Sequence, residues 1–163
     1  ERFSGIDFDV FTEHMRKEVP RLAACNEIDA ITPENLATLD RIMAFGKKLA
    51  LLTGRRLFEI EHLVATEHPL NRRMEKFYHR DNLEHMKPNP KVFDQPLKDF
   101  NVRPDEAVYV GDILHDAAAA KGAGLHFIAV LEEGIRMKED FAEFPVDFFA
   151  NKFVDILEYI RTH

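Results

Sequence analysis

The stretch Val108-Tyr109-Val110-Gly111-Asp112-Ile113-Leu114-His115-Asp116 decides how this chain folds. It opens with a short apolar run, turns at a glycine followed by an aspartate, and continues into an alanine-rich segment, 117–120. An apolar run without alternation predicts a strand buried on both faces of a parallel sheet. Alanine favours helix, and its small side chain allows close packing on a sheet. The stretch therefore predicts a strand, a tight turn and a helix, with Asp116 as a candidate helix cap.

Similar apolar runs occur on either side of this stretch. Residues 48–53 and 126–131 predict two further strong strands, while 77–78 and 146–149 predict a short strand and an edge strand. Amphipathic segments with apolar residues at three- and four-residue steps separate these runs and predict helices. The alternation indicates an α/β fold whose parallel sheet is covered by helices on both faces.

The N-terminal part does not follow this alternation. Residues 8–22 show helical periodicity, and a second helix is predicted to start at Thr32 as N-cap, with Pro33 at its first position. The apolar face of that second helix would comprise Leu36, Leu39, Ile42 and Met43. We therefore expect two parts, a helical segment over 1–30 and an α/β core over 31–163.

Composition narrows the classes of protein. The chain has 163 residues, which suits one domain, and its formal charge of -7 argues against nonspecific nucleic-acid binding. Its one cysteine, Cys25, allows no intrachain disulfide and is interpreted as a packing residue. No apolar run approaches the roughly 20 residues that a membrane span needs. We expect a cytoplasmic protein without membrane partners.

Candidate functional residues follow two of the predicted strands. In an open parallel sheet, ligands bind beyond the carboxyl ends of the strands. Thr53 and Gly54 follow the first strong strand, and Asp112 follows the second, with Asp116 one helical turn further on. Lys87 lies just ahead of a predicted helix, in Met86-Lys87-Pro88-Asn89-Pro90. We expect these residues to meet in one crevice.

These residue types suit a phosphate group and a divalent metal ion. A threonine hydroxyl and the backbone N–H groups of the following turn can donate to phosphate oxygens. The ammonium group of Lys87 supplies a compact positive charge. Asp112 and Asp116 offer hard oxygen ligands, and Mg²⁺ typically takes one or two carboxylates together with waters and a substrate phosphate. The pattern predicts electrostatic stabilisation of phosphoryl transfer.

The order of these motifs resembles that of the haloacid dehalogenase superfamily. The stretch 108–116 is similar to the fourth motif of its phosphatases, Leu51-Leu52-Thr53-Gly54 to the second, and Lys87-Pro88-Asn89-Pro90 to the third. The similarity extends from about Thr32 to the C-terminus. It implies a Rossmann-like fold and Mg²⁺-dependent hydrolysis of a small phosphomonoester through an aspartyl-phosphate.

The resemblance also implies roles for single residues. Thr53 and Gly54 would bind the phosphoryl group, and Lys87 would neutralise it together with the nucleophile. Asp112 would bind Mg²⁺, and Asp116 would support the metal shell. A sugar-phosphate mutase would use the same residues, so both activities stay open.

The nucleophile of the family lies in a first motif, Asp-x-Asp. The candidate here is Asp7-Phe8-Asp9-Val10-Phe11, in which Phe11 departs from the Thr or Val of the motif. In the alternative that we favour, this stretch begins a remnant of a helical cap, and the true first motif would lie upstream of Glu1 and be absent. The isolated chain would then be inactive, and a binding or assembly module is the third hypothesis for its function. The oligomeric state of the protein also stays open.

Two smaller expectations complete the analysis. The histidines show no tight ligand spacing, so a zinc site is not expected. Arg55-Arg56 could contact a substrate, but solvated side chains are the favoured interpretation, and Arg72-Arg73 is interpreted as solvated too. Glu132-Glu133-Gly134 follows the third strong strand and could border the site.

Overall fold

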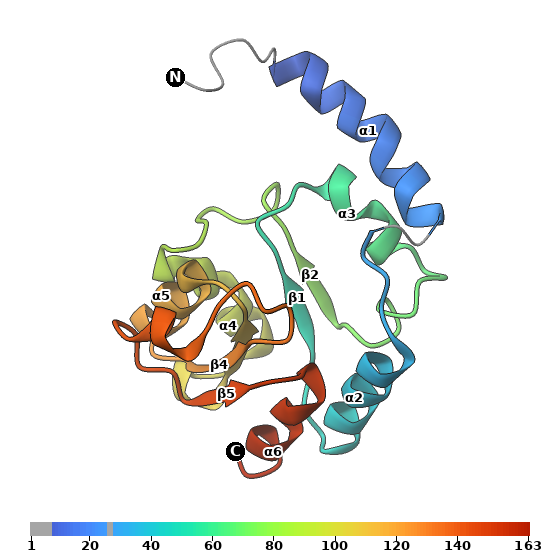
Figure 1. The fold of residues 1–163 in the computed structure, drawn as a ribbon. Helices are drawn as coiled ribbons and strands as arrows, with labels where there is room; N and C mark the ends of the chain where they lie inside the picture. The colour runs from blue at the N-terminus through green and yellow to red at the C-terminus, as the bar shows by residue number, and fades with distance from the viewer. Residues whose placement is uncertain (1–7, 26–27) are drawn as a thin grey trace.

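The computed structural model describes residues 8–25 and 28–163, which form an α/β protein (Figure 1). Its helices are α1 (Phe8–Ala24), α2 (Pro33–Ala44), α3 (Leu57–Val64), α4 (Asp94–Phe100), α5 (Leu114–Gly122) and α6 (Ile156–Ile160). Its strands are β1 (Ala50–Leu52), β2 (Lys76–Tyr78), β3 (Val108–Gly111), β4 (His126–Val130) and β5 (Phe148–Ala150). Short 3₁₀ turns lie at Pro90–Phe93, Pro104–Glu106, Lys138–Phe141 and Phe153–Asp155. The predicted α/β class is confirmed.

The strands form two parallel sheets within the described residues. β1 pairs with β2, with Leu51 opposite Phe77. β3, β4 and β5 form the other sheet in that order, with Tyr109 opposite Phe127. All of the pairings are parallel, as the uninterrupted apolar runs predict.

The two sheets share one hydrophobic core. Buried residues of α2, α3 and α6 pack with Ile128 of β4, and Leu51 of β1 and Val108 of β3 pack against the same cluster. A second cluster joins α5 to the other face of β4 through Phe127. The apolar run of β4 is buried on both faces, because each face meets a different cluster.

The prediction that residues 48–53 form a fully buried strand is wrong both in the length of the strand and in its burial. β1 covers only Ala50–Leu52, in which Ala50 is exposed and the two leucines are half-buried. Among the described strands, β1 hydrogen-bonds only to β2, so the edge of β1 that faces away from β2 carries no strand. The apolar sequence predicts a strand buried on both faces, whereas β1 is short and only half-buried.

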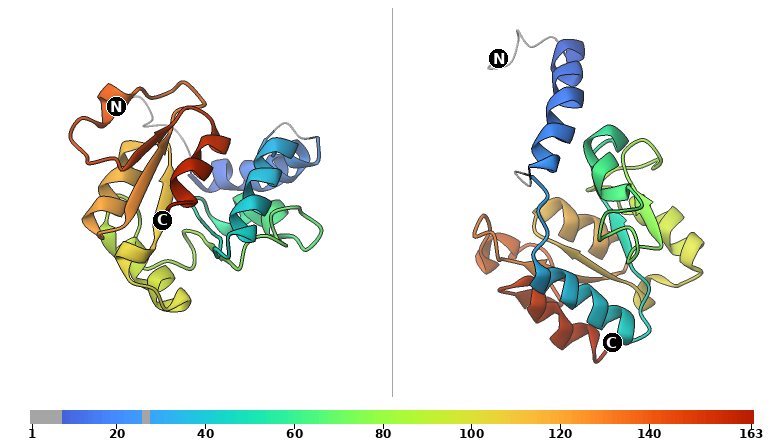
Figure 2. Two further views of the ribbon diagram at one scale, coloured as in Figure 1. Left: turned by 90° about the horizontal axis from the view of Figure 1, so that it is seen from below. Right: turned by 90° about the vertical axis from the view of Figure 1, so that its right-hand side faces the viewer.

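Helix α1 confirms the helical periodicity of 8–22, and Pro20 is accommodated inside it. The helix projects away from the two sheets and packs on α3, where Val19 is buried and the guanidinium of Arg16 lies over the ring of Phe58 (Figures 1 and 2). No helix in the described part of the chain is both long and apolar enough to cross a membrane.

The start of α2 is also as predicted. The hydroxyl of Thr32 accepts a hydrogen bond from the backbone N–H of Asn35 at 3.1 Å, and Pro33 occupies the first turn. Met43, which we assigned to the apolar face, is instead exposed, because only the Leu39 and Ile42 side of the last turns meets the core. Gly46 adopts a positive φ of 75° where the chain leaves the helix.

Candidate active site

Lys87 and Asp116 form a buried ion pair. The Nζ of Lys87 lies 2.6 Å from Oδ1 of Asp116, and the two side chains are 14% and 4% exposed. Lys87 also donates a hydrogen bond of 2.8 Å to the hydroxyl of Tyr109 in β3. That hydroxyl in turn donates to the carbonyl of Leu52 at 3.4 Å. This chain of contacts connects the Lys87 loop with the tips of β3 and β1.

The turn after β3 is built around the carboxylate of Asp116. Its Oδ2 accepts the backbone N–H groups of Asp112 at 3.2 Å and Ile113 at 3.4 Å. Asp116 therefore occupies the third position of α5, and the expectation that it is the N-cap is corrected to Ile113, whose side chain has no oxygen for capping. A Cβ on Gly111 would lie 2.3 Å from the same Oδ2, so only glycine fits there.

The ion pair fixes the charge of Lys87. Burial acts to lower the pKa of Lys87, but the neighbouring Tyr109 and Asp116 outweigh burial, so the pKa is raised above its ordinary value. Burial, with the nearby Asp116 carboxylate, raises the pKa of Tyr109 to about 12. At neutral pH the site therefore presents a charged ammonium group and a neutral phenol.

Thr53 and Gly54 lie next to this pair. The N–H of Thr53 donates to the carbonyl of Tyr78 at 2.9 Å and extends the pairing of β1 with β2. Its hydroxyl accepts the N–H of Arg55 at 3.2 Å, which closes a tight turn. A Cβ on Gly54 would lie 3.7 Å from the terminal methyl of Met86, so this turn adjoins the Lys87 loop. The structure thus brings the three predicted places, the Thr53 turn, the Lys87 loop and the turn after β3, close to one another.

Asp112 differs from Asp116 in being exposed. It borders a small recess together with Glu133 and Arg136, which belong to the segment after β4. Glu133 therefore lies beside the site, as anticipated. Glu132 does not, because its carboxylate accepts the N–H of Phe153 at 2.8 Å. In the part of the chain that is described, no group of three histidine, cysteine or acidic side chains converges as a preformed metal site. An exposed carboxylate at Asp112 with a second at Asp116 still fits Mg²⁺, which needs only one or two carboxylates.

Sequence reasoning missed two groups near the site. Tyr109 was assigned only to the strand, although a buried tyrosine hydroxyl needs a partner, and that need was the available signal. Arg136 was not singled out; its Nε is buried and has no hydrogen-bond partner among the described residues.

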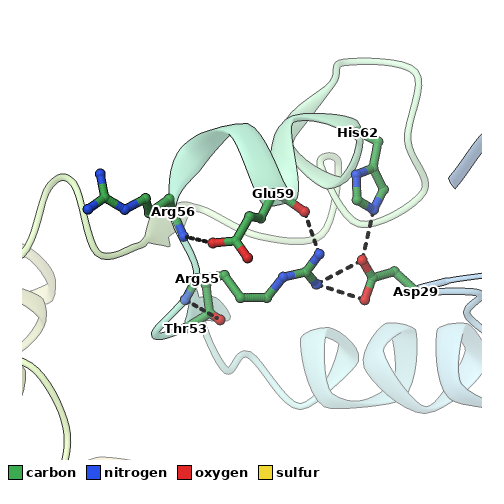
Figure 3. A network of polar contacts seen from close by, with 6 residues as sticks. All are labelled: Asp29, Thr53, Arg55, Arg56, Glu59 and His62. Carbon is green, nitrogen blue, oxygen red and sulfur yellow. Dashed lines mark hydrogen bonds and ion pairs between the residues drawn. The ribbon is translucent and has the colours of Figure 1, made fainter. Parts of the chain in front are cut away.

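The interpretation of Arg55 as a solvated side chain is also wrong. Its guanidinium donates two hydrogen bonds of 2.8 Å to the carboxylate of Asp29 and one to the carbonyl of Glu59 (Figure 3). Nε2 of His62 lies 2.9 Å from the same carboxylate. The segment between α1 and α2 is thereby attached to the turn that contains Thr53.

The fold is that of an α/β protein in which the Thr53 turn, Asp112 and Asp116 follow the carboxyl ends of parallel strands, with Lys87 beside them. The family model described as haloacid dehalogenase-like hydrolase matches residues 7–130. The chain belongs to this family, and the resemblance of its motifs is confirmed.

Individual relatives agree with this assignment. The chain is 29% identical over 139 residues to the pyrophosphatase PpaX of Anoxybacillus flavithermus, a match that covers 81% of this chain and 62% of the relative. It is 32% identical over 81 residues to PpaX of Listeria welshimeri, covering 50% of this chain and 37% of the relative. The chain thus spans between about a third and two thirds of the length of these relatives.

Solved structures share the fold. CbbY from Rhodobacter sphaeroides in complex with phosphate superposes with a TM-score of 0.71 and 25% identity, covering 91% of this chain and 64% of CbbY. The structure of a haloacid dehalogenase-like hydrolase from Bacteroides fragilis superposes with a TM-score of 0.72 at 22% identity. The match covers 94% of this chain and 73% of the hydrolase. The latter likeness establishes the fold alone.

Proposed function

We propose that the protein is a Mg²⁺-dependent phosphatase that hydrolyses a small phosphorylated metabolite through an aspartyl-phosphate. The observation that carries this proposal is the buried contact between Lys87 and Asp116 beside the Thr53–Gly54 turn. A charged lysine held at the tip of a parallel strand is suited to binding an anion that reacts there. PpaX proteins are named as pyrophosphatases, which supports a phosphate-containing substrate.

Each residue has a defined task in this reaction. The Thr53 hydroxyl and the N–H groups of its turn donate to the phosphoryl oxygens and orient the group. Lys87 keeps one ammonium proton beyond its contacts with Asp116 and Tyr109, and this proton can point to a phosphoryl oxygen. The charge of Lys87 stabilises the negative charge that is shared among the phosphoryl oxygens as the ester bond breaks.

Mg²⁺ would be held by Asp112 directly, with Asp116 supporting the metal shell through the turn that it organises. When bound, the ion would neutralise charge on the phosphate oxygens. Asp116 contributes in a second way, since it accepts the N–H of Asp112 and so fixes the backbone that carries the ligand. The exposure of Asp112 leaves room for waters and a substrate oxygen.

None of the residues to which a task has just been given is the nucleophile of the reaction. Asp7 lies outside the described residues, and Asp9 belongs to the first turn of α1, at the end that projects away from the sheets (Figure 1). The resemblance implies an aspartate at the end of a central strand. The half-exposed β1, which hydrogen-bonds only to β2 among the described strands, supports the docking of such a strand along its unpaired edge.

The chemical step follows from that placement. The carboxylate of the incoming aspartate attacks phosphorus, an O–P bond forms, and the ester oxygen leaves with its electron pair and takes up a proton. Water then attacks the phosphorus and releases phosphate and the carboxylate. On this proposal 31–163 form the α/β core, and 1–30 contain a remnant of a helical cap.

The test is hydrolysis of 4-nitrophenyl phosphate by the complete gene product. We expect activity with Mg²⁺, its loss on addition of EDTA, and a fall of about 100-fold or more for Asp112→Asn. Asp105→Asn is the matched control, because Asp105 is exposed and pairs with Arg103. Activity that survives both EDTA and Asp112→Asn would reject the metal assignment.

A further inference from the structure

A second concave surface lies at the opposite ends of β1 and β2. A pocket of about 350 Å³ is formed where the chain leaves α2 and just before each of the two strands begins. The N–H of Glu75 donates to the carbonyl of Leu49 at 2.8 Å, so the segments before β1 and before β2 are joined here. In parallel strands the starts and the carboxyl ends are at opposite edges, so this pocket is separate from the Thr53 turn.

The charge of this pocket contrasts with the charge of the chain. Lys47, Lys48, Arg72 and Arg73 line it, and Glu75 is the acidic residue among its lining residues. The chain as a whole carries a formal charge of -7. The carboxylates of Glu75 and of Asp40, which pairs with Arg73, offset part of this charge. The remaining excess of cations from two separate segments makes a local positive potential, which attracts small anions.

One wall of the pocket is rigid. The side chain of Arg73 is 5% exposed, and its guanidinium donates hydrogen bonds of 2.7 and 2.6 Å to the carboxylate of Asp40 and of 2.7 Å to the carbonyl of Pro69. This contact contradicts the expectation that Arg73 is solvated. Because Arg73 is held in place, it fixes the backbone of its neighbour Arg72 at the pocket.

The other cations remain available to a ligand. Lys47 and Arg72 are exposed, and neither lies within ion-pair distance of an acidic side chain in the described ranges. Lys48 makes a long ion pair of 3.8 Å with Glu75, with both side chains largely exposed, and its ammonium group also lies 5.9 Å from the centre of the Phe100 ring. Such an exposed pair contributes little and can be exchanged for a ligand contact.

We propose that this pocket binds a small anion that carries two or more phosphate groups. Lys47 and Lys48 from one side and Arg72 from the other can each meet a phosphate oxygen, and two linked phosphates reach both sides. The half-buried Met74 and Leu49 supply an apolar floor on which an organic part of the ligand can lie.

Lysines at the end of α2 could simply stabilise the negative end of the helix dipole. That account covers Lys47 and Lys48, which follow the helix. It does not account for Arg72, which comes from the segment before β2 and shares the same pocket. The convergence of the two segments is what distinguishes a binding site from a helix end.

The test is a titration of the ¹⁵N-labelled protein with two non-hydrolysable probes, followed by the shifts of backbone amides. Methylenediphosphonate represents an inorganic diphosphate, and α,β-methylene-ADP represents a nucleoside diphosphate. We expect at least one probe to shift the amides of 46–49 and 72–75 in a saturable way. The stronger probe identifies the source of the anion, and adenosine alone should leave these amides unshifted.

Variants make the result specific. Lys47→Glu/Arg72→Glu should weaken binding at least tenfold without changing the thermal midpoint by more than a few degrees, because both side chains are exposed. Lys17→Glu/Lys138→Glu, with the same change of charge elsewhere, should bind as the unchanged protein does.

Asp112→Asn separates this proposal from the proposed function. Asp112 follows β3, in the other sheet, and does not line the pocket, so the pocket should bind normally in that variant. Shifts confined to the Thr53, Lys87 and Asp112 region would overturn the proposal, and so would equal binding by both charge-reversed pairs.

Discussion

Lys87 and Arg73 are both buried basic side chains that pair with an aspartate, and the two pairs differ in what they leave free. The guanidinium group of Arg73 donates hydrogen bonds to both carboxylate oxygens of Asp40 and to a backbone carbonyl. Lys87 contacts one oxygen of Asp116 and one hydroxyl, next to a strand tip with an exposed carboxylate. The comparison teaches that burial and charge alone do not mark a functional cation. What matters is whether hydrogen-bonding capacity remains where a ligand can reach.

The largest effect is expected when Lys87 is removed. Lys87→Met should lower hydrolysis by the complete gene product by about 100-fold or more, because the charge that stabilises the phosphoryl group is lost. It should also lower the free energy of unfolding by about 3 to 5 kcal/mol, because Asp116 is left buried without its cation. Steady-state kinetics and urea denaturation check the two parts. A Lys87→Met protein with normal activity would remove Lys87 from the site.

Gly111→Ala tests the turn that carries Asp112. The added Cβ would lie 2.3 Å from Oδ2 of Asp116, so the carboxylate has to move away from the N–H groups it accepts. We expect a loss of about 1 to 3 kcal/mol in the free energy of unfolding and a higher Mg²⁺ concentration for half-maximal activity. Gly46→Ala is the control for removing a glycine, since no atom lies within 4 Å of its Cβ position and it lies away from Asp112; its positive φ of 75° adds some strain. Equal Mg²⁺ requirements in Gly111→Ala and the unchanged protein would contradict the account.

A smaller effect is expected for the hydroxyl of Tyr109. Tyr109→Phe removes the acceptor for Lys87 and the donor to Leu52, at a cost of about 1 kcal/mol in stability. Because the pKa of Tyr109 is raised to about 12, the phenol stays neutral between pH 5 and 9, and the variant should lower activity by the same factor throughout that range. A pH–rate profile checks this. A ratio of rates that changes with pH would show that the phenol takes part in proton transfer.

The smallest effect on activity is expected at the other pair. Arg73→Met should leave hydrolysis within about twofold, because Arg73 lies at the starts of the strands. Its effect on stability should depend on pH. The pKa of Asp40 is lowered from 3.8, first of all by its hydrogen bonds with Arg73, so the stabilisation is present above pH 3.8 and is lost as the pH falls through the folded value. Urea denaturation of both proteins across acidic pH should show their stabilities converging.

The strands were the most predictable part of the fold, because short apolar runs such as that of β4 are explained by burial on both faces. The helix at 8–22 and the cap at Thr32 depended on local patterns and were predicted as well. The division into two sheets was not predictable from these patterns. Burial of a strand is inferred from its own residues, whereas its neighbours depend on the rest of the chain, and this is why the exposure of β1 was missed.

Within the candidate site, the placing of Thr53, Lys87, Asp112 and Asp116 at neighbouring strand tips followed from strand order. The roles of these residues remain predictions. The partner of the Tyr109 hydroxyl and the burial of Arg73 depend on contacts between segments distant in sequence. Side-chain partners of that kind leave no periodic signal in the sequence. The place of Asp116 at the third helical position, by contrast, is set locally, by its contacts with the N–H groups of Asp112 and Ile113.

The contact between Arg55 and Asp29 has a mechanical consequence. The backbone N–H of Arg55 donates a hydrogen bond to the hydroxyl of Thr53, while its guanidinium donates to the carboxylate of Asp29, in the segment between α1 and α2 (Figure 3). One residue therefore joins the Thr53 turn to the segment that follows α1. A change in the backbone of that turn would displace Arg55 and, with it, the contact that Arg55 makes with Asp29.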